Sequence, residues 1–452
     1  MKAGRLWLGG VMLTSCFGVL SGCTATPQKT DEAASVDSTA PKQTTEQQTV
    51  VRAPARPTQS SANGQPKKMS AAQQRLAQLR QLRQQEWDRL QAQKQQRAQA
   101  QPRKQAQARQ QSVYAQNQQG SGPVSVTYGG KGVGNYYATS LTGDFAGDPR
   151  LLSFIEQMSA RGFNRNYLLG VFSQVRNRDE VARLWASPAS ASSPGGWYSY
   201  RSKFVTPANI QKGTQFWRQY AGHLQRAHQQ YGVDPEYIVG IMGVETRWGR
   251  ILGKHRIIDA LTTSALTNQR RSDFFFEELA DYMLMTRTER MDPLAPKGSY
   301  AGAMGYGQFM PSSFRSYAVD FDGDGVKDLW NPVDAIGSIA NYFAQHGWRS
   351  GQEVAVPADV ASNDYANVPD GFKVKYSPGQ LAQIGVAPKN GRWSNTSRTH
   401  LLALSTVPGG YKEPWIGYNN FYVITRYNHS NYYAMAVHQL ANAVKNNVGG
   451  GN

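Results

Sequence analysis

Cysteine is almost absent from this chain, which carries only Cys16 and Cys23 among its 452 residues. Two thiols cannot build a disulfide framework, and they cannot supply the four thiolates of a structural zinc site. Charged side chains are also sparse, at 18% of the residues, whereas the chain contains 44 glycines and 23 tyrosines. This balance favours an uncharged binding surface rich in aromatic rings over a surface dense in charge.

Acidic residues are outnumbered by basic ones, 31 to 49, which gives a formal net charge of +18. An excess of this size is typical of nucleic-acid-binding proteins, so its location along the chain matters. Residues 24–125 hold 15 basic and 6 acidic side chains, whereas residues 126–452 hold 32 and 25. Half of the excess therefore lies in about a quarter of the chain, and we expect no nucleic-acid partner.

That basic stretch has few apolar side chains, and residues 71–120 alone contain 19 glutamines. Such a composition buries too little apolar surface to offset the conformational entropy lost on folding. We therefore predict that residues 23–140 form a disordered tether rich in Gln, Ala and Arg, with a marginal helix at about 70–95. A solvated linker is the main interpretation, and a segment attracted to anionic polymers or lipid headgroups is the alternative.

The first 22 residues are predicted to be a lipoprotein signal peptide. Lys2 and Arg5 precede an apolar stretch that is too short to span a bilayer as a permanent helix. The stretch ends in Leu-Ser-Gly-Cys, which resembles a bacterial lipobox and makes Cys23 the lipidated residue. An ordinary signal peptide that happens to contain Cys23 is the alternative. Thr24 follows instead of Asp, which by resemblance to lipoprotein sorting favours the periplasmic face of the outer membrane.

The pattern changes in residues 141–450, which we predict to be one mainly helical folded unit. Asp148 is a typical N-cap, Pro149 a typical first helical residue, and Gly162 a typical stop. Further helical periods cover residues 166–175, 215–232, 235–249, 274–288 and 432–444. Short β-like runs cover residues 353–360, 372–376 and 421–425. They predict a small β-containing part at about residues 351–425.

The segment 235–249 is apolar almost throughout, so we predict a buried helix there. Asp234 is expected to cap this helix, Pro235 to start it and Gly249 to end it.

Glu245 lies in the last turn of that apolar helix. Burial and the negative end of the helix dipole both raise the pKa of a carboxyl group. A raised pKa is what a general acid needs near neutral pH. An ion pair with Arg247 or Arg250 at a solvated helix end is the alternative, and composition alone leaves the two interpretations open.

Small residues alternate with aromatic rings in residues 299–313, Ser-Tyr-Ala-Gly-Ala-Met-Gly-Tyr-Gly-Gln-Phe-Met-Pro-Ser-Ser. Small side chains let the backbone approach a ligand closely. Tyr306 and Phe309 offer flat ring faces, and Gln308 offers both a donor and an acceptor. Rings and amides together suit sugars, whereas close helix packing is the alternative explanation for the small residues.

Taken together, these segments resemble the membrane-bound lytic murein transglycosylase B family, which comprises murein-cleaving bacterial lipoproteins. Further matching segments are residues 206–221, 331–348 and 422–441, and the resemblance runs from about residue 143 to 444. It implies a mainly α fold with a lysozyme-like core of the goose-type or soluble lytic transglycosylase kind. It also implies an embedded EF-hand-like loop and a small β-containing subdomain. The Gln-rich tether lies outside the resemblance.

Most glycosidases flank the scissile bond with two carboxylates. The sequence offers no second acid in a comparably apolar context, because Glu277 and Glu278 are expected to face solvent from an amphipathic helix. The resemblance implies that one carboxylate suffices. Glu245 would protonate the glycosidic oxygen between MurNAc and GlcNAc and then accept the proton of the MurNAc C6 hydroxyl as that oxygen attacks C1. The product is a 1,6-anhydro ring, formed without water.

The resemblance also implies roles for other residues. Six of them match positions that line the groove or orient Glu245, namely Ser299, Gln308, Tyr342, Tyr427, Asn428 and Tyr433. Arg270 and Arg271 match positions that could meet the anionic peptide stem, and Tyr200 is a weaker candidate platform for a sugar ring. Packing in the core is the alternative for each of the tyrosines.

The segment that begins at Asp320 has carboxylates at positions 1, 3, 5 and 9 and glycine at position 6, so it resembles an EF-hand loop. Position 12 is Asn331 instead of the usual glutamate. In the resembled family the loop is longer, and Asp334 matches the closing acid. We expect a structural Ca²⁺ and no organic cofactor, with an unoccupied turn as the alternative. The expected ligands are Asp320, Asp322, Asp324, Val326 and Asp334.

Three functions remain open at this stage. The first is a lytic transglycosylase, the second a hydrolytic muramidase with an unrecognised second acid, and the third a catalytically inert peptidoglycan-binding lipoprotein. The expected partners are glycan strands with their peptide stems and the outer membrane, reached through lipidated Cys23. Cell-wall synthesis proteins are further candidates, and a monomer is the default.

Overall fold

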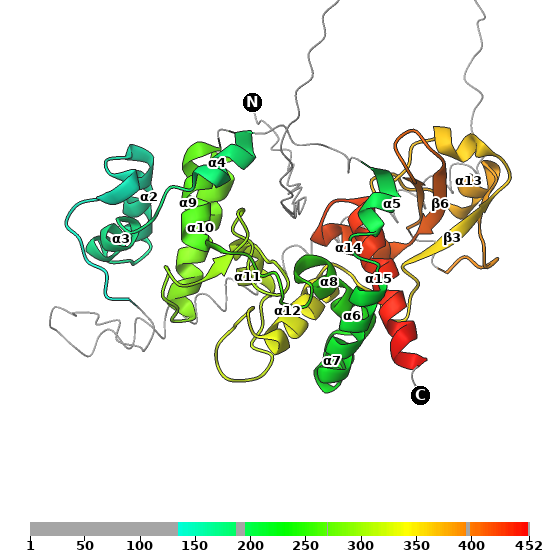
Figure 1. Ribbon diagram of the computed structural model, residues 1–452, viewed down its shortest axis with the longest axis horizontal. Coiled ribbons are helices and arrows are strands. Elements are labelled where there is room, and N and C mark those ends of the chain that lie inside the picture. Colours follow the sequence, from blue (N-terminus) through cyan, green and yellow to red (C-terminus); the bar gives the residue numbers. More distant parts are fainter. Residues whose placement is uncertain (1–133, 187–194, 269, 395–397, 451–452) are drawn as a thin grey trace, which may run out of the picture. The chain divides into compact units, whose positions relative to one another are not determined.

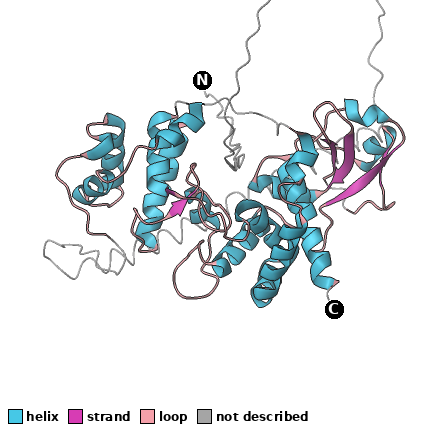
Figure 2. Ribbon diagram, in the orientation of Figure 1, coloured by secondary structure: helices cyan, strands magenta, loops and turns pink. Residues whose placement is uncertain are grey.

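The computed structural model describes residues 134–186, 195–268, 270–394 and 398–450. Helices predominate in these ranges, and the strands form one short ladder and one small sheet (Figure 1, Figure 2). The predicted signal peptide, Cys23 and nearly all of the tether, including its marginal helix, lie outside the described residues. Within the described ranges, no helix is both long and apolar enough to cross a membrane.

The first helices of the folded part form where the sequence predicts them. Helix α2 (Pro149–Ala160) begins after Asp148, whose carboxylate accepts the backbone N–H groups of Arg150 and Leu151 at 2.9 and 3.2 Å. Such a cap satisfies backbone donors that a helix start leaves unpaired. Helix α3 (Arg165–Phe172) follows, and its Leu168–Phe172 stretch is buried.

Apart from α13 (Pro378–Gln383), which belongs with the small sheet described below, eleven further α-helices follow in the described ranges. Their bounds are α4 (Asp179–Ala186), α5 (Gly196–Arg201), α6 (Pro207–Gln219), α7 (Ala221–Tyr231), α8 (Pro235–Thr246), α9 (Ile257–Thr267), α10 (Ser272–Thr288), α11 (Pro311–Tyr317), α12 (Pro332–Gln345), α14 (Asn419–Tyr427) and α15 (Asn431–Gly449). The predicted continuous helix over 215–232 is wrong. Tyr220, with φ −111° and ψ 21°, separates α6 from α7.

Helix α8 lies at the centre of one group of helices. Ten of its twelve residues are buried, and it packs against α6, α7, α12 and α15 (Figure 1). A helix that is apolar on all sides needs neighbours on all sides, because no face of it suits water. The apolar run in the sequence therefore identifies the helix around which α6, α7, α12 and α15 assemble.

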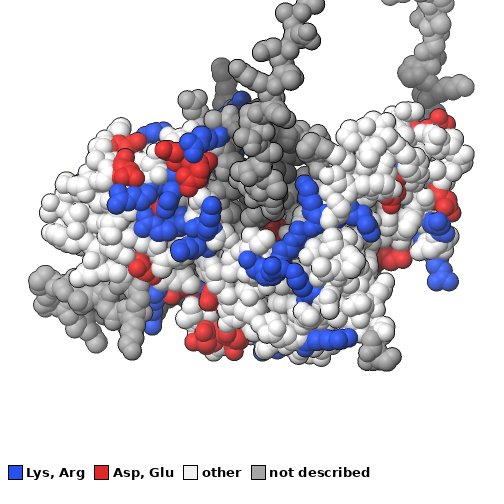
Figure 3. Space-filling model, in the orientation of Figure 1, with Lys and Arg blue, Asp and Glu red and all other residues white. Residues whose placement is uncertain are grey.

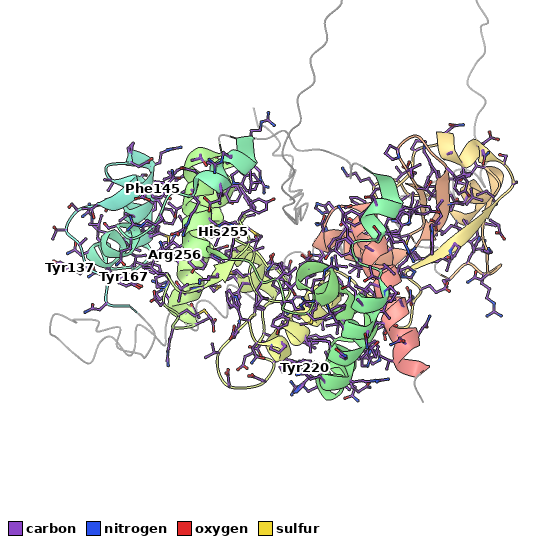
Figure 4. All side chains as sticks on the ribbon, in the orientation of Figure 1. Tyr137, Phe145, Tyr167, Tyr220, His255 and Arg256 are labelled. Carbon is purple, nitrogen blue, oxygen red and sulfur yellow. The ribbon has the colours of Figure 1, made fainter. Side chains whose placement is uncertain are left out.

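A buried carboxylate ties the start of α9 to the segment that precedes α4. Asp259 is fully buried, and its carboxylate accepts hydrogen bonds from Arg256 at 2.8 Å and from Arg178 at 2.7 Å. Arg256 lies at the entry to α9, next to His255 (Figure 4). Two guanidinium groups offset the cost of burying one carboxylate, which is why the pairing is retained inside the fold.

The small sheet has the strand order β4-β3-β6-β5, and all its neighbouring strands are antiparallel. Its strands are β3 (Ala355–Val360), β4 (Val386–Pro388), β5 (His400–Ser405) and β6 (Lys412–Gly417). The short helix α13 (Pro378–Gln383) packs on β4, and one face of the sheet has a small core of its own. The separate ladder pairs β1 (His255–Arg256) with β2 (Lys297–Gly298).

Two of the three predicted β runs are wrong. Residues 421–425 belong to α14, because Phe421 and Ile424 lie one turn apart and both pack in the core. Residues 372–376 follow a turn at Gly371, which has φ 89°. Within the described ranges, this second run contributes an isolated bridge between Tyr376 and Thr399. The first run is confirmed as β3.

Candidate functional site

The helix that carries Glu245 ends earlier than predicted. Helix α8 stops at Thr246, and Arg247 and Trp248 then adopt left-handed φ values of 53° and 55° before Gly249 at 85°. Left-handed backbone costs a residue with a side chain about 1–2 kcal/mol, so two in succession need support from the fold. Trp248 provides it, since its backbone N–H donates to Met242 O at 3.1 Å.

The start of α8 also differs in detail from the prediction. Pro235 is the first residue, as expected, but the Asp234 side chain makes no capping bond to the helix. Its carboxylate instead accepts the indole N–H of Trp348 at 3.3 Å. At the other end, the indole of Trp248 folds back and donates to Val239 O at 3.0 Å.

Glu245 is half-buried, and the hydroxyl of Tyr433 donates to its Oε1 at 2.6 Å. Burial raises the pKa of Glu245 from its ordinary value of 4.5 to about 7, and the hydrogen bond from Tyr433 opposes that rise. A carboxyl group in this state is partly protonated at neutral pH, so it can donate a proton and take one back.

The competing interpretation of Glu245 as a surface ion pair finds no support in the described residues. Arg247 donates to the carbonyl of Lys203, and its guanidinium lies 4.7 Å from the ring centre of Phe204. Ion pairs within 4 Å in the described ranges do not include Glu245.

Tyrosines from three helices surround the carboxylate. Tyr433 comes from the first turn of α15, and Tyr427 from the end of α14. The negative charge of Glu245 helps to raise the pKa values of Tyr427 and Tyr433, and also that of Tyr200 on α5, although burial is the largest cause in each case. Tyr200, Tyr427 and Tyr433 therefore share the surroundings of Glu245, and three of the predicted site residues are brought together.

Tyr342 and Tyr427 connect this cluster to the glycine-rich segment. The Tyr427 hydroxyl donates to Gly307 O at 2.5 Å, and the Tyr342 hydroxyl donates to Arg426 O at 2.6 Å. The two rings lie edge to face, with centres 4.9 Å apart. A Cβ atom on Gly307 would lie 2.8 Å from the Tyr427 hydroxyl, so glycine at this position allows the contact.

The glycine-rich segment is a series of tight turns fixed by its own side chains. The Ser299 hydroxyl accepts the backbone N–H of Ala303 at 3.0 Å. Gln308 has a left-handed φ of 51°, and its side-chain amide donates to Gly305 O at 2.9 Å. These two predicted residues thus hold the loop that lies against Tyr427. A left-handed backbone is unfavourable for glutamine, so the conformation of Gln308 has to be held by the surrounding turn.

The remaining predicted site residues have other surroundings. Arg270 and Arg271 precede α10, and both of their backbone N–H groups donate to the side chain of Asn268, at 3.2 and 3.1 Å. The guanidinium of Arg271 lies 4.0 Å from the ring centre of Phe274. Asn428 follows α14 directly, in extended backbone.

The expectation that Glu278 faces solvent is wrong. Its side chain is buried, and it accepts the backbone N–H and the hydroxyl of Ser312 at 2.9 and 2.6 Å. Burial raises the pKa of Glu278, and the acidic neighbour that adds to the rise is Asp281. Glu278 is therefore a buried acid, but it holds the start of α11 and does not contribute to the raised pKa of Glu245.

Sequence reasoning missed Thr246, which joins the end of α8 to the glycine-rich segment. Its hydroxyl accepts the N–H of Gly249 at 3.1 Å and lies 3.1 Å from the carbonyl of Tyr306. The next residue outward, Arg247, has a buried Nη1 without a hydrogen-bond partner among the described residues. The role of Thr246 has no local sequence signal, because its partner Tyr306 lies 60 residues further along the chain.

Acidic side chains gather over the loop between α11 and α12 (Figure 3). Carboxylate oxygens of Asp320, Asp322 and Asp334 lie within 4.8 Å of one another. Asp324 does not belong to this group, and its carboxylate accepts the N–H of Val326 at 2.8 Å. A cluster made of oxygen donors alone fits Ca²⁺, which is bound by carboxylates and carbonyls.

Asp334 closes the loop from the first turn of α12. Its carboxylate accepts three backbone N–H groups, those of Phe321 at 2.7 Å, Asp322 at 3.1 Å and Asp328 at 2.8 Å. Asn331, at the twelfth position, donates to Asp322 at 2.6 Å. Asn331 thus orients a carboxylate of the cluster.

Comparisons with known proteins agree with this geometry. Residues 147–442 match the family described as the transglycosylase SLT domain. The membrane-bound lytic murein transglycosylase B of Escherichia coli (strain K12) is 52% identical over 312 residues, which cover 67% of this chain and 85% of that protein.

Solved structures show the same similarity. Escherichia coli lytic transglycosylase SLT35 in complex with calcium is 51% identical, with a TM-score of 0.64 over 68% of this chain and 96% of its own. SltB3 from Pseudomonas aeruginosa in complex with NAG-anhNAM-pentapeptide is 30% identical, with a TM-score of 0.59 over 66% of this chain and 78% of its own. These matches confirm the mainly helical, lysozyme-like fold class predicted from the sequence.

Proposed function

Because the chain belongs to the transglycosylase SLT domain family, we propose that it is a lytic transglycosylase that cleaves peptidoglycan between MurNAc and GlcNAc, with Glu245 as its single acid and base. The observation that carries this proposal is the environment of Glu245. A pKa of about 7, set by burial and by one hydrogen bond from Tyr433, makes both protonation states of the carboxyl accessible in a single turnover.

In the first step, the protonated Glu245 donates its proton to the glycosidic oxygen. The bond between that oxygen and C1 of MurNAc breaks, the GlcNAc hydroxyl leaves, and positive charge develops at C1. The hydrogen bond from Tyr433 stabilises the carboxylate that is left behind, which favours the transfer. The N-acetyl group of the substrate lies next to C1 and stabilises the charge there.

In the second step, the carboxylate of Glu245 takes the proton of the MurNAc C6 hydroxyl while O6 attacks C1. A bond between C1 and O6 forms, and Glu245 returns to its protonated state. The reaction uses no water, so no second carboxylate is needed to activate a water molecule. The carboxylate of Glu278 accepts two hydrogen bonds from Ser312, so it is not free to activate a water molecule. This argues against the hydrolytic muramidase. The raised pKa of Glu245, about 7, suits an acid catalyst and argues against a binding protein without activity.

The other predicted site residues are proposed to hold the substrate. Ser299, Gln308, Tyr342, Tyr427, Asn428 and Tyr200 would line the groove beside Glu245, supported by the shared tyrosine cluster and the glycine-rich turns. The guanidinium of Arg271 lies over the ring of Phe274, and its N–H groups would bind a stem carboxylate. Arg270 is exposed and would act with it.

Ca²⁺ is proposed as a structural ion of the loop at residues 320–334. Asp320, Asp322 and Asp334 would hold it, with Asp324 and the carbonyl of Val326 completing the set. The calcium complex of SLT35 supports this assignment. The ion would offset the mutual repulsion of the loop carboxylates and thereby fix the start of α12.

The N-terminal region is proposed to anchor the enzyme at the periplasmic face of the outer membrane through lipidated Cys23. Support comes from the lipobox-like sequence and from the relative named as membrane-bound. The folded unit carries 32 basic and 25 acidic side chains in residues 126–452, a modest excess that suits a polymer with carboxylates on its peptide stems.

Digestion of purified murein sacculi tests the proposed reaction. The full-length protein is expected to release muropeptides that end in 1,6-anhydro-MurNAc, lighter by one water molecule than the products of hydrolysis, because O6 replaces water as the nucleophile. Mass spectrometry of the released muropeptides distinguishes the two products. Hydrated products would establish the muramidase instead, and the absence of release would establish the inert binding protein.

Replacement of Tyr433 by Phe is expected to shift the pH dependence of the reaction. The variant loses the hydrogen bond that lowers the pKa of Glu245, so that pKa rises further. Since the first step needs the protonated acid, the decline of kcat at high pH should move upward by about one pH unit, and kcat at its maximum should fall about tenfold. The measurement is kcat from pH 5 to pH 9 on sacculi.

A matched control is Tyr282→Phe, another buried tyrosine, whose hydroxyl donates to Pro293 O at 2.7 Å. It should leave the midpoint of the decline in place. If Tyr433→Phe leaves the midpoint unchanged as well, Tyr433 does not set the protonation of Glu245.

A further inference from the structure

A second groove lies between α5, β6 and α15, with a volume of about 660 Å³. Its lining includes Tyr198 and Arg201 from α5, Trp415 from β6, and Gln439 and Asn442 from α15. None of these residues belongs to the tyrosine cluster around Glu245. We call this hollow the α5–α15 groove, and Figure 1 shows the helices that form two of its walls close together.

Helix geometry separates this groove from the site of Glu245. Gln439 and Asn442 lie six and nine residues after Tyr433, so at about 100° per residue their directions differ from that of Tyr433 by about 120° and 180° around the axis of α15. On α5, the directions of Tyr198 and Tyr200 differ by about 160°, by the same rule. Both helices thus present one face to Glu245 and a different face to the α5–α15 groove.

The chemistry of the groove suits an uncharged polar ligand with flat faces. Tyr198 is 54% exposed, and Trp415 is half-buried, with its indole N–H donating to Glu413 at 2.8 Å. Arg201 donates to the side chain of Gln439. One arginine and one glutamate balance in charge, while the side-chain amides of Gln439 and Asn442 provide fixed donors and acceptors.

The aromatic surface continues past the groove onto the β5–β6 turn. Five large hydrophobic side chains are exposed in the described ranges, and three of them, Tyr198, Val407 and Tyr411, gather here. Backbone bonds hold them together, since Tyr198 N–H donates to Thr406 O at 3.1 Å. A second hollow of about 540 Å³ shares Trp415 with the groove.

We propose that the α5–α15 groove binds a second stretch of N-acetylated glycan strand and thereby holds the enzyme on murein while Glu245 cleaves elsewhere. The proposal rests on the proposed function for its ligand, because an enzyme of cross-linked peptidoglycan meets several strands at once. Rings that stack on sugar faces, together with amides that bond hydroxyl and N-acetyl groups, match amino sugars. A groove without net charge favours the glycan over the anionic stem peptide.

Binding to a soluble glycan tests the proposal first. The probe is the N-acetylglucosamine hexamer, titrated into full-length protein that carries Glu245→Gln so that nothing is cleaved. Calorimetry should find two sites per chain in this background. Adding Tyr198→Ala should leave one site, whereas Tyr198→Phe, which keeps the ring, should retain both. A single site in all three proteins would overturn the proposal.

Binding to sacculi tests the consequence on the polymer. In the Glu245→Gln background, Tyr198→Ala and Trp415→Ala should each weaken co-sedimentation with sacculi about fivefold or more, the size typical of losing an aromatic anchor. Tyr137→Ala is the matched control, because Tyr137 is 70% exposed and lies beside α3 (Figure 4). It should leave binding unchanged. Equal binding by Tyr198→Ala and the control would overturn the proposal.

Steady-state kinetics distinguish a failure of this proposal from a failure of the proposed catalytic role of Glu245. In protein with Glu245 intact, Tyr198→Ala should raise KM on sacculi about fivefold. It should leave kcat unchanged on a soluble substrate made of two disaccharide-peptide units joined by one MurNAc–GlcNAc bond. A fall of kcat on the soluble dimer would show that Tyr198 acts at Glu245 and would overturn the second site. Failure of the proposed reaction would instead appear as a lack of anhydro products in the parent protein itself.

Discussion

Glu245→Gln is expected to lower kcat on murein by at least about 1,000-fold, near the upper range for one group in general acid–base catalysis. Glutamine has nearly the shape of glutamate and can keep the contact with the Tyr433 hydroxyl at Oε1. It has no proton to donate to the glycosidic oxygen, and it cannot take the proton of the C6 hydroxyl. One substitution therefore removes both steps, whereas in a two-carboxylate enzyme it would remove one role.

The same substitution should not weaken the fold. The folded chain keeps the proton of Glu245 up to a pKa of about 7, whereas an unperturbed carboxyl loses it near 4.5. Between these pH values the folded state binds more protons than the unfolded one, so stability falls as pH rises and stays lower above pH 7. Glutamine does not titrate. The variant should therefore be more stable than the parent above pH 7, and the difference should vanish below pH 4.5.

Three measurements check this result: release of muropeptides from sacculi, co-sedimentation with sacculi, and thermal unfolding at pH 5 and pH 8. Glu277→Gln is the matched control, because Glu277 is exposed on α10 and takes no part in the site. It should leave release unchanged. Substantial release by Glu245→Gln, with the fold intact, would contradict the assignment of Glu245 as both acid and base.

The sequence predicted the central helix and its glutamate because both depend on local pattern. An apolar run as long as α8 has to be surrounded by other elements, whatever the details of the neighbours. Burial of Glu245 in its last turn was therefore one of the two interpretations that the pattern left open. The partner of Glu245 is different. Tyr433 lies 188 residues away on α15, and from the residues alone it is one tyrosine among 23. Only the family resemblance singled it out.

Two predictions from the sequence were wrong because residue type was given more weight than the spacing of the buried residues. Glu278 follows Phe275 by three residues and precedes Tyr282 by four, which places it on the buried stripe of α10, so the spacing contained the signal that the charge concealed. Residues 421–425 are aromatic or β-branched and favour a strand by propensity. The structure places them in a helix, because the helical spacing of Phe421 and Ile424 lets both side chains pack in the core. The left-handed turn at Arg247 and Trp248 has no local signal, since Trp248 packs against Gly213 on α6.

Asp334→Ala is expected to lower the free energy of unfolding by about 3–5 kcal/mol and to remove the response of the protein to calcium. Asp334 is 1% exposed, and its carboxylate accepts the backbone N–H groups of Phe321, Asp322 and Asp328. Alanine leaves these three donors without their acceptor. It also removes the carboxylate that faces Asp320 and Asp322, so an ion bound there loses its closing ligand.

Thermal unfolding in excess Ca²⁺ and in chelator measures both effects. In the parent protein, calcium at about 100 times its dissociation constant should add about 2.7 kcal/mol of stability, because the ion binds the folded chain alone. The variant should show the same midpoint in both buffers. Asp273→Ala is the matched control, since Asp273 is exposed in the first turn of α10 and should cost less than about 1 kcal/mol. An Asp334→Ala variant that calcium stabilises as much as the parent would show that the ion, if bound, lies elsewhere.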